Sequence, residues 1–329
     1  MFGSLFIVAE IASAHCGSPE VAKKLVRAAS DAGADAVNLQ KFCRDSLLVP
    51  SDPRYKNFER IEIEEDEWKD IIKCAKDAGI KVIGEVFDER SADFMVGEGI
   101  DFIKIHPTDM LNPFMLKHVA KEDVPIILSA GGCTFDEVES ALNIVKDNGG
   151  EVVCIVYGFQ NFPTKLEDTN MLVLKSLKER FGLPVGFHDH IDAEDELALY
   201  LPLVAVGLGA TLIEKHITDD RSKKGFDYHS SLEPHEFKRM VEILRRVEKS
   251  MGDGKLCLSD AEKNYRERMM KKIVASRTIP KGKVIEMEDI TFKRAKGGIY
   301  PNEFQKIVGR KSRVEIKEDE VITPEKVEE

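Results

Sequence analysis

The sequence predicts a (β/α)8 TIM barrel followed by a small β-rich domain. First, eight short apolar segments alternate with amphipathic helical segments along the first ~250 residues, which is the pattern of a barrel. Second, the short segments are apolar at consecutive positions, as expected for parallel strands covered on both faces. Third, no GxGxxG turn follows the first segment, which argues against the alternative, a doubly wound open sheet.

The predicted strands are short and rich in β-branched and other apolar residues. They cover residues 5–11, 36–40, 81–86, 102–105, 125–129, 152–156, 185–187 and 211–214. The predicted helices have apolar residues at helical spacing. They cover residues 19–32, 66–78, 135–148, 166–181, 194–208 and 234–251.

Capping residues mark several of these helix ends. Ser18 precedes the first helix and Gly33 follows it, while Gly79 follows the second. Thr134, with Glu137 three residues later, forms the capping-box pattern at the start of the third helix. The helix bounds therefore rest on two independent signals, periodicity and capping.

Two regions depart from this alternation. Residues 43–65 form a long loop between the second strand and its helix, and such loops lie at the active-site end of a barrel. After Gly254 the chain becomes strongly charged, and we expect a linker helix over residues 255–272. Strand-like runs separated by turns then predict a β-rich domain over residues 273–329, so that the barrel covers residues 1–254.

Composition excludes several classes of function. Lys and Arg number 48 against 59 Asp and Glu, a formal net charge of −11, which argues against a nucleic acid or an anionic membrane as partner. The six cysteines form no CxxC pair, which favours reduced thiols over disulfides or a zinc cage. Neither a basic leader nor an apolar run of ~20 residues is present, so we expect a cytoplasmic protein.

Polar residues collect at the predicted carboxyl ends of the strands, where barrel enzymes carry their chemistry. Five of the eight histidines lie there. His190 and His216 end neighbouring strands, so their imidazoles could converge on one divalent ion, with Glu10 or Asp189 completing the site. Mixed nitrogen and oxygen ligation suits Mn²⁺, Fe²⁺, Zn²⁺ or Mg²⁺. The alternative is that each histidine only forms hydrogen bonds in a loop.

Lys104 lies within a predicted strand between two isoleucines. An inward-facing lysine is desolvated unless it meets an anion, so we expect a phosphate or carboxylate group of a substrate as its partner. The alternative is a buried ion pair with Glu85. The Gly-Gly turn after Ser129 offers backbone N–H groups that could also hold an anion.

Short motifs follow one another in a fixed order along the chain. The first half contains Ala9-Glu10-Ile11, His15-x-Gly17, Gly33-Ala34-Asp35-Ala36-Val37 with Gln40, and Lys104-Ile105. The second half contains Ser129-x-Gly131, Phe162-Pro163-Thr164 with Asp168-x-Asn170, Gly186-x-x-Asp189-His190 and Glu214-Lys215-His216. The tail adds Ile279-x-Lys281-Gly282, Asp289, Lys293-Arg294 and Gly298-Ile299. In these motifs the chain resembles the N-acetylneuraminate (sialic acid) synthase family, and its tail resembles that family's antifreeze-like (SAF) domain.

The resemblance implies an enzyme that forms a carbon–carbon bond between phosphoenolpyruvate and an N-acylated amino sugar, such as N-acetylmannosamine. It implies a divalent ion, Mn²⁺ or Mg²⁺, held by His190 and His216, with Glu10 near the sugar and the metal. It also implies a domain-swapped homodimer in which Arg294 reaches the sugar in the partner's barrel. Lys104, Ser129 and Asn170 would lie around phosphoenolpyruvate. The further candidate substrate-binding residues are Gln40, His106, His188 and Asp189.

Five positions depart from the family pattern. Asn38 stands in place of a lysine, Glu85 of a threonine, Pro107 and His188 of serines, and Ala14 of an asparagine. In the family the first four normally help to hold phosphoenolpyruvate. Loss of a cation and gain of a carboxylate are expected to weaken anion binding by roughly a few kcal/mol.

His106 and His188 could compensate for these changes, because an imidazolium ring donates hydrogen bonds to phosphate. Phosphoenolpyruvate binding would then strengthen as the pH falls. Two alternatives to the synthase remain: a metal-dependent lyase or aldolase on the same scaffold that does not use phosphoenolpyruvate, and a non-catalytic sugar-binding protein.

Overall fold

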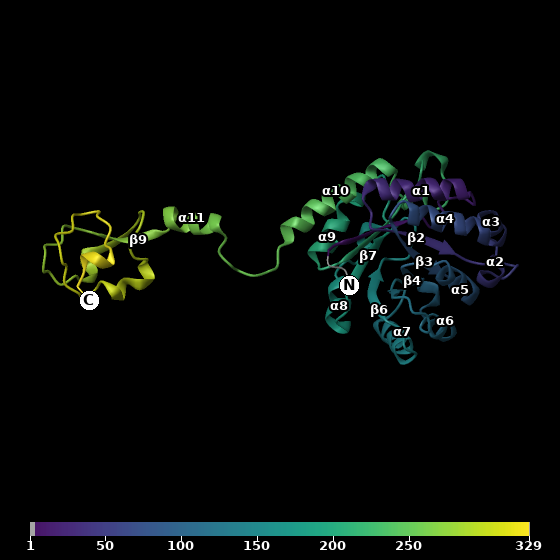
Figure 1. The fold of residues 1–329 in the computed structure, drawn as a ribbon, viewed down its shortest axis with the longest axis horizontal. Coiled ribbons are helices and arrows are strands. Elements are labelled where there is room, and N and C mark those ends of the chain that lie inside the picture. The colour runs from purple at the N-terminus through teal and green to yellow at the C-terminus, as the bar shows by residue number, and fades with distance from the viewer. Residues whose placement is uncertain (1–3, 329) are drawn as a thin grey trace. The chain divides into compact units, whose positions relative to one another are not determined.

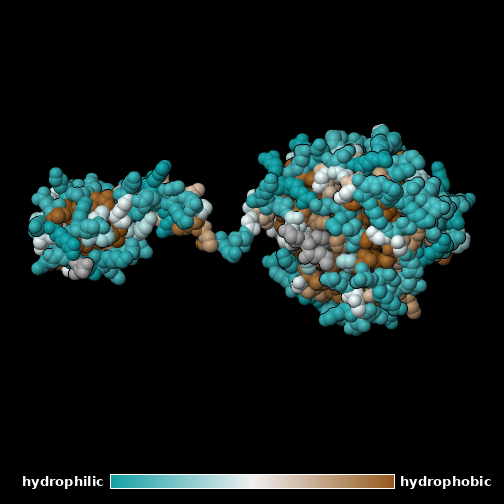
Figure 2. All heavy atoms as spheres, viewed as in Figure 1, coloured by the Kyte–Doolittle hydropathy of each residue, from teal (hydrophilic) through white to brown (hydrophobic). Residues whose placement is uncertain are grey.

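The computed structural model describes residues 4–328. These divide into two compact units, residues 4–252 and residues 253–328 (Figure 1). Hydrophilic residues cover most of the face of each unit that Figure 2 shows. Across the described residues, no helix combines the length and the apolar character needed to cross a membrane.

Within residues 4–328, eight parallel strands close into a barrel in sequential order, with the eighth paired to the first. The strands are β1 (Phe6–Glu10), β2 (Ala36–Lys41), β3 (Lys81–Val86), β4 (Phe102–Ile105), β5 (Ile126–Ser129), β6 (Val152–Tyr157), β7 (Val185–Asp189) and β8 (Leu212–His216). The closed order confirms the predicted (β/α)8 barrel and rules out the open sheet.

Helices surround the strands (Figure 1). They are α1 (Pro19–Ala32), α2 (Arg44–Leu47), α3 (Tyr55–Ile61), α4 (Glu65–Asp77), α5 (Glu89–Gly97), α6 (Pro113–Val119), α7 (Phe135–Asp147), α8 (Val173–Phe181), α9 (Leu201–Gly207) and α10 (Pro234–Met251). Short 3-10 turns lie at Pro107–Asp109, Leu166–Asp168, Glu196–Leu199, Arg221–Lys223 and Tyr228–Ser230. The Ser18 hydroxyl accepts from the Val21 N–H at 3.3 Å, and the Thr134–Glu137 capping box is present, as the sequence predicts.

Several helices differ from the sequence prediction. The segment predicted as a loop contains α2 and α3, and the prediction lacked α5 and α6, which have only nine and seven residues and therefore a weak periodic signal. The predicted helix over residues 166–181 is broken at Asn170, whose φ of 44° is left-handed. The predicted helix over residues 194–208 is split before α9, because Pro202 lacks an N–H group and favours the first turn of a helix.

The inside of the barrel is apolar at its amino end and polar at its carboxyl end. The apolar layer contains Phe6, Val8, Ile83, Phe102 and Leu212, all buried. Alternate residues of a strand face the same side, so the positions two residues further along also point inward. The larger core lies outside the barrel wall, where the strands meet the helices. The polar inward residues therefore have no route to bulk solvent except through the carboxyl end.

The second unit is small and has its own core. It contains α11 (Asp260–Met269) and an antiparallel pair formed by β9 (Lys271–Ala275) and β10 (Ile290–Arg294). Short 3-10 turns lie at Met287–Asp289, Pro301–Lys306 and Pro324–Lys326. Its core is mainly isoleucine. The buried Asp289 carboxylate ties two turns together, since it accepts from Arg277 Nε at 2.7 Å and Lys283 Nζ at 2.6 Å.

Candidate active site

A cavity of about 720 Å³ opens at the carboxyl end of the barrel. That volume is in the usual range for a small-molecule site. Each strand from β2 to β8 contributes at least one residue to its lining, and Ala12 and Ser13, which follow β1, complete it. Its polar lining includes Gln40, Glu85, Lys104, His106, Ser129, His188, His190 and His216.

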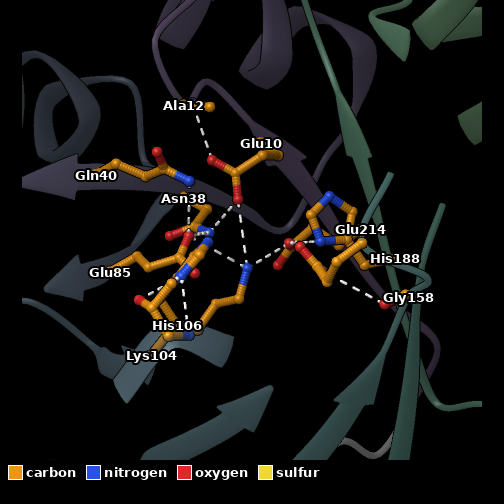
Figure 3. A network of polar contacts seen from close by, with 12 residues as sticks. Glu10, Ala12, Asn38, Gln40, Glu85, Lys104, His106, Gly158, His188 and Glu214 are labelled. Atoms are coloured by element: carbon orange, nitrogen blue, oxygen red, sulfur yellow. Dashed lines mark hydrogen bonds and ion pairs between the residues drawn. The ribbon is translucent and has the colours of Figure 1, made fainter. Parts of the chain in front are cut away.

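Lys104 lies at the centre of a buried polar network at the floor of the cavity (Figure 3). Its Nζ is 2.5 Å from Glu214 Oε1, 3.3 Å from Glu85 Oε2 and 3.4 Å from Glu10 Oε2. Asn38 Nδ2 donates to Glu85 Oε2 at 2.9 Å and also to Glu10. The structure thus places Lys104 in buried ion pairs, the alternative that the sequence left open.

The charges in this network do not balance if all groups are ionised. Among the described side chains, three carboxylates meet one ammonium group. Burial raises the pKa of Glu10 well above its usual value, and the neighbouring Glu85 and Glu214 carboxylates raise it further against the opposing effect of Lys104. Burial opposes the charged form of Lys104, but the three carboxylates outweigh it and raise its pKa. Lys104 is therefore charged, and burial favours the protonated form of Glu10.

Three imidazole rings lie beside this network. The ring centroids of His188 and His190 are 4.1 Å apart. The His216 centroid lies 5.0 Å from that of His188 and 5.2 Å from that of His190. One nitrogen from each ring falls within 4.8 Å of the other two. Burial lowers the pKa of all three rings well below the usual value, so they are neutral at pH 7 and carry lone pairs that can bind a metal.

A hydrogen bond fixes one of these rings, and a carboxylate oxygen lies beside another. His190 Nδ1 is 2.9 Å from the Phe159 carbonyl oxygen, and His188 Nδ1 is 2.9 Å from Glu214 Oε1. In the described part of the chain, His188 Nε2 and both ring nitrogens of His216 are buried without a hydrogen-bond partner. Buried polar atoms are normally paired, so this donor set fits a divalent ion.

Three further predicted residues line the cavity. Ser129 Oγ is buried and lacks a hydrogen-bond partner among residues 4–328. His106 is half-buried; its Nδ1 is 2.9 Å from Thr108 Oγ1, and burial lowers its pKa. Gln40 donates from Nε2 to Glu85 Oε2 at 3.0 Å. Three hydrogen-bonding side chains thus line the cavity that also contains Lys104.

The other predicted residues lie elsewhere. Asp189 alternates with His188 and faces outward, where its Oδ1 pairs with Lys215 Nζ at 2.5 Å. Asn170 is exposed, in the loop before α8. Arg294 is exposed at the end of β10 in the second unit. Contacts of these three residues with a substrate stay predictions.

Sequence reasoning missed two features of the site. Glu214 was not predicted as a site residue, and His188 was predicted to bind phosphate rather than to join the other two imidazoles. The available signal was spacing: His188 and His190, like Glu214 and His216, are two residues apart, so each pair faces the same side of a strand.

Comparisons with known proteins agree with this architecture. The family model described as "NeuB family" matches residues 25–256, and that of the SAF domain matches residues 272–328. The N,N'-diacetyllegionaminic acid synthase of Legionella pneumophila is 34% identical over 322 residues, which cover 92% of this chain and 89% of that protein.

Two further proteins are similar over most of this chain. The human N-acetylneuraminate-9-phosphate synthase is 30% identical over 338 residues, covering 98% of this chain and 92% of that protein. A crystal structure of N-acetylneuraminic acid synthetase from Leptospira borgpetersenii, in complex with citrate, superposes with a TM-score of 0.76. It shares 26% identity and covers 82% of this chain and 93% of that one.

Proposed function

This chain belongs to the NeuB family, and we propose that it is a synthase that condenses phosphoenolpyruvate with an N-acylated amino sugar. The products are a 2-keto-3-deoxy sugar acid and inorganic phosphate. The observation that carries the proposal is the full-length similarity to named synthases, joined to a cavity in which a buried cation faces three neutral imidazoles.

Each group of the cavity has a role in this reaction. Lys104 binds an anionic group of phosphoenolpyruvate, which requires it to give up part of its contact with the three carboxylates. A divalent ion at His190 and His216 would supply a Lewis acid for the aldehyde oxygen of the open-chain sugar. Ser129 Oγ, which is buried at the same wall, offers a hydrogen bond to the substrate.

Glu10 is the proton donor in this account. Burial raises its pKa and so favours the protonated form, and that proton passes to the aldehyde oxygen as carbon 3 of phosphoenolpyruvate bonds to the aldehyde carbon. Water then adds to carbon 2 and returns one proton to Glu10. The adduct collapses to the ketone as the bond between carbon 2 and the phosphate oxygen breaks, and the second proton of the water leaves with the phosphate. One water is consumed and one phosphate is released for each new carbon–carbon bond.

We also propose a cytoplasmic homodimer in which the second unit of one chain covers the barrel of its partner. The SAF match supports this arrangement, as does the exposed position of Arg294, whose guanidinium group is free to reach a sugar hydroxyl or carboxylate.

Phosphate release tests the proposal. Purified protein is incubated with phosphoenolpyruvate, a panel of N-acylated amino sugars, and either Mn²⁺, Mg²⁺ or Zn²⁺. Release must require both substrates, and Lys104→Met must abolish it, whereas Lys121→Met, which alters an exposed lysine of the barrel unit, must not. Phosphate release that is independent of the sugar would contradict a synthase.

One observation favours a second function, a metal-dependent aldolase or lyase that does not use phosphoenolpyruvate. Asn38 and Glu85 surround Lys104 with acceptors where an anion would bind, and Glu85 is only 1% exposed. Such an enzyme would cleave a 2-keto-3-deoxy sugar acid to pyruvate and the aldehyde without phosphate. Release of pyruvate from the sugar acid, together with no phosphate release from phosphoenolpyruvate, would favour it.

A further inference from the structure

We propose that His188 is a third protein ligand of the metal, so that His188, His190 and His216 form a three-imidazole centre. This centre would prefer ions of the zinc, cobalt and nickel type to Mn²⁺ or Mg²⁺. The inference rests on the proposed function only for what the ion does in catalysis. The binding itself follows from the geometry of the three rings.

The placement of the rings supports a shared ion. His188 and His190 are inward-facing positions of the same strand end, and His216 ends the neighbouring strand β8. Their ligand nitrogens lie within 4.8 Å of one another, and the three rings are almost fully buried. Ligand nitrogens bound to one ion at about 2.1 Å must lie within roughly 3–4 Å of each other, so only small side-chain rotations are needed.

The contacts of the Nδ1 atoms leave the Nε2 lone pairs of His190 and His188 free to bind a metal. His190 Nδ1 faces the Phe159 carbonyl oxygen, which only accepts, so Nδ1 carries the proton and Nε2 keeps the lone pair. His188 Nδ1 likewise faces the Glu214 carboxylate, and its unpartnered Nε2 keeps the lone pair. Metal-binding histidines typically donate from the second nitrogen to a carbonyl or carboxylate in this manner.

This geometry also argues against a phosphate-binding role for His188. With Nδ1–H committed to Glu214, the neutral ring has only a lone pair at Nε2, and a lone pair repels a phosphate oxygen. A metal ion uses that lone pair directly. The two roles therefore make opposite demands on Nε2, and the 2.9 Å contact of Nδ1 with Glu214 Oε1 favours the metal.

A third imidazole changes which ion the site prefers. Imidazole nitrogens suit Zn²⁺, Co²⁺, Ni²⁺ and Fe²⁺, whereas carboxylate and water oxygens suit Mg²⁺ and Mn²⁺. Three protein ligands also leave a coordination position open, as in catalytic zinc sites. All three rings line the cavity, so that position can be reached by a substrate oxygen.

Metal titration of the stripped full-length protein tests the inference. Calorimetry with Zn²⁺ and Co²⁺, together with the visible absorption of bound Co²⁺, is compared for wild type, His188→Ala and His188→Ser. The control is His235→Ala, which removes an exposed imidazole on α10. We expect both His188 variants to weaken Zn²⁺ and Co²⁺ binding about tenfold or more, since losing even an outer-sphere partner costs about 10- to 100-fold. Mn²⁺ binding should change little.

Wild-type protein alone gives a second measurement, which does not depend on the variants folding. X-ray absorption at the zinc edge counts the imidazole rings bound to Zn²⁺, and we expect three. Two rings, or His188 variants with wild-type affinity for Zn²⁺, would overturn the inference. Loss of phosphoenolpyruvate turnover with three bound rings would instead contradict the proposed function and leave the metal site intact.

Discussion

Glu85→Gln should strengthen phosphoenolpyruvate binding, because Glu85 is the carboxylate that replaces a neutral residue of the family pattern beside Lys104. The substitution removes one negative charge and keeps an oxygen that can accept from Asn38, Gln40 and Lys104, which now contact Glu85 Oε2 at 2.9, 3.0 and 3.3 Å. The network can therefore keep its hydrogen bonds while the charge around Lys104 changes by one unit.

The expected size of the effect follows from these distances. An anion bound at Lys104 lies within about 5 Å of the Glu85 carboxylate, and at an effective dielectric constant of about 20 two unit charges at that distance repel by about 3 kcal/mol. That energy corresponds to about a hundredfold in Kd. Water entry and side-chain relaxation reduce it, so we expect an improvement of about tenfold to a hundredfold.

Calorimetric titration with phosphoenolpyruvate measures this change at constant pH, salt and metal. The control is Glu139→Gln, which removes the same charge from an exposed residue of α7 that pairs with Arg180 outside the cavity. Its affinity should match wild type. If Glu85→Gln binds no better than the control, Glu85 does not repel the substrate and the anion does not bind at Lys104.

Three further predictions follow from buried charges and from the second unit. Burial lowers the pKa of His15 to about 4, so the folded barrel binds fewer protons than the unfolded chain between about pH 6.5 and pH 4, and it loses up to about 3 kcal/mol as the pH falls through that window. The assay is urea unfolding followed by the fluorescence of Trp68, the single tryptophan, whose ring centroid lies 6.0 Å from that of His15. The loss of stability should appear in wild type and be much smaller in His15→Asn. A bound anion would raise the pKa of Glu10 further, so phosphoenolpyruvate affinity should rise as the pH falls; an unchanged slope in Glu10→Gln would assign the proton uptake to another group. Mixing inactive Lys104→Met and Arg294→Ala proteins should restore activity through mixed dimers, and a monomeric mass by light scattering would refute the exchanged second unit.

The barrel could be predicted because its signals are local. Each strand is an apolar run with its own flanking turn, and helices such as α1 and α7 carry capping residues that the structure uses as predicted. The helix predictions were wrong where tertiary packing, rather than local sequence, decides whether a segment is helical. Short helices such as α6, with seven residues, have too few turns to show periodicity. The break at Asn170 depends on a left-handed backbone conformation, which an asparagine tolerates but does not require.

The site could be predicted in part for a similar reason. Strand-end positions identified Lys104, Glu10 and the histidines as neighbours, because parallel strands end together. What spacing alone does not give is the partner of each polar atom. The same inward lysine could face a substrate or a carboxylate, and only the register of β3, β4 and β8 shows that Glu85 and Glu214 both reach it. The contact of His188 with Glu214, on which the proposed metal-ligand role of His188 depends, is likewise set by the tertiary structure.

The condensation itself is the most direct test of the central claim. Phosphoenolpyruvate, an N-acylated amino sugar and metal-loaded protein are incubated together, and inorganic phosphate and the sugar acid are quantified in the same sample, the acid by mass spectrometry. We predict equal amounts of phosphate and of an acid whose mass is that of the sugar plus one pyruvate unit. Metal-loaded, folded protein that forms no such acid with any sugar of the panel, but cleaves 2-keto-3-deoxy sugar acids to pyruvate, would contradict the synthase.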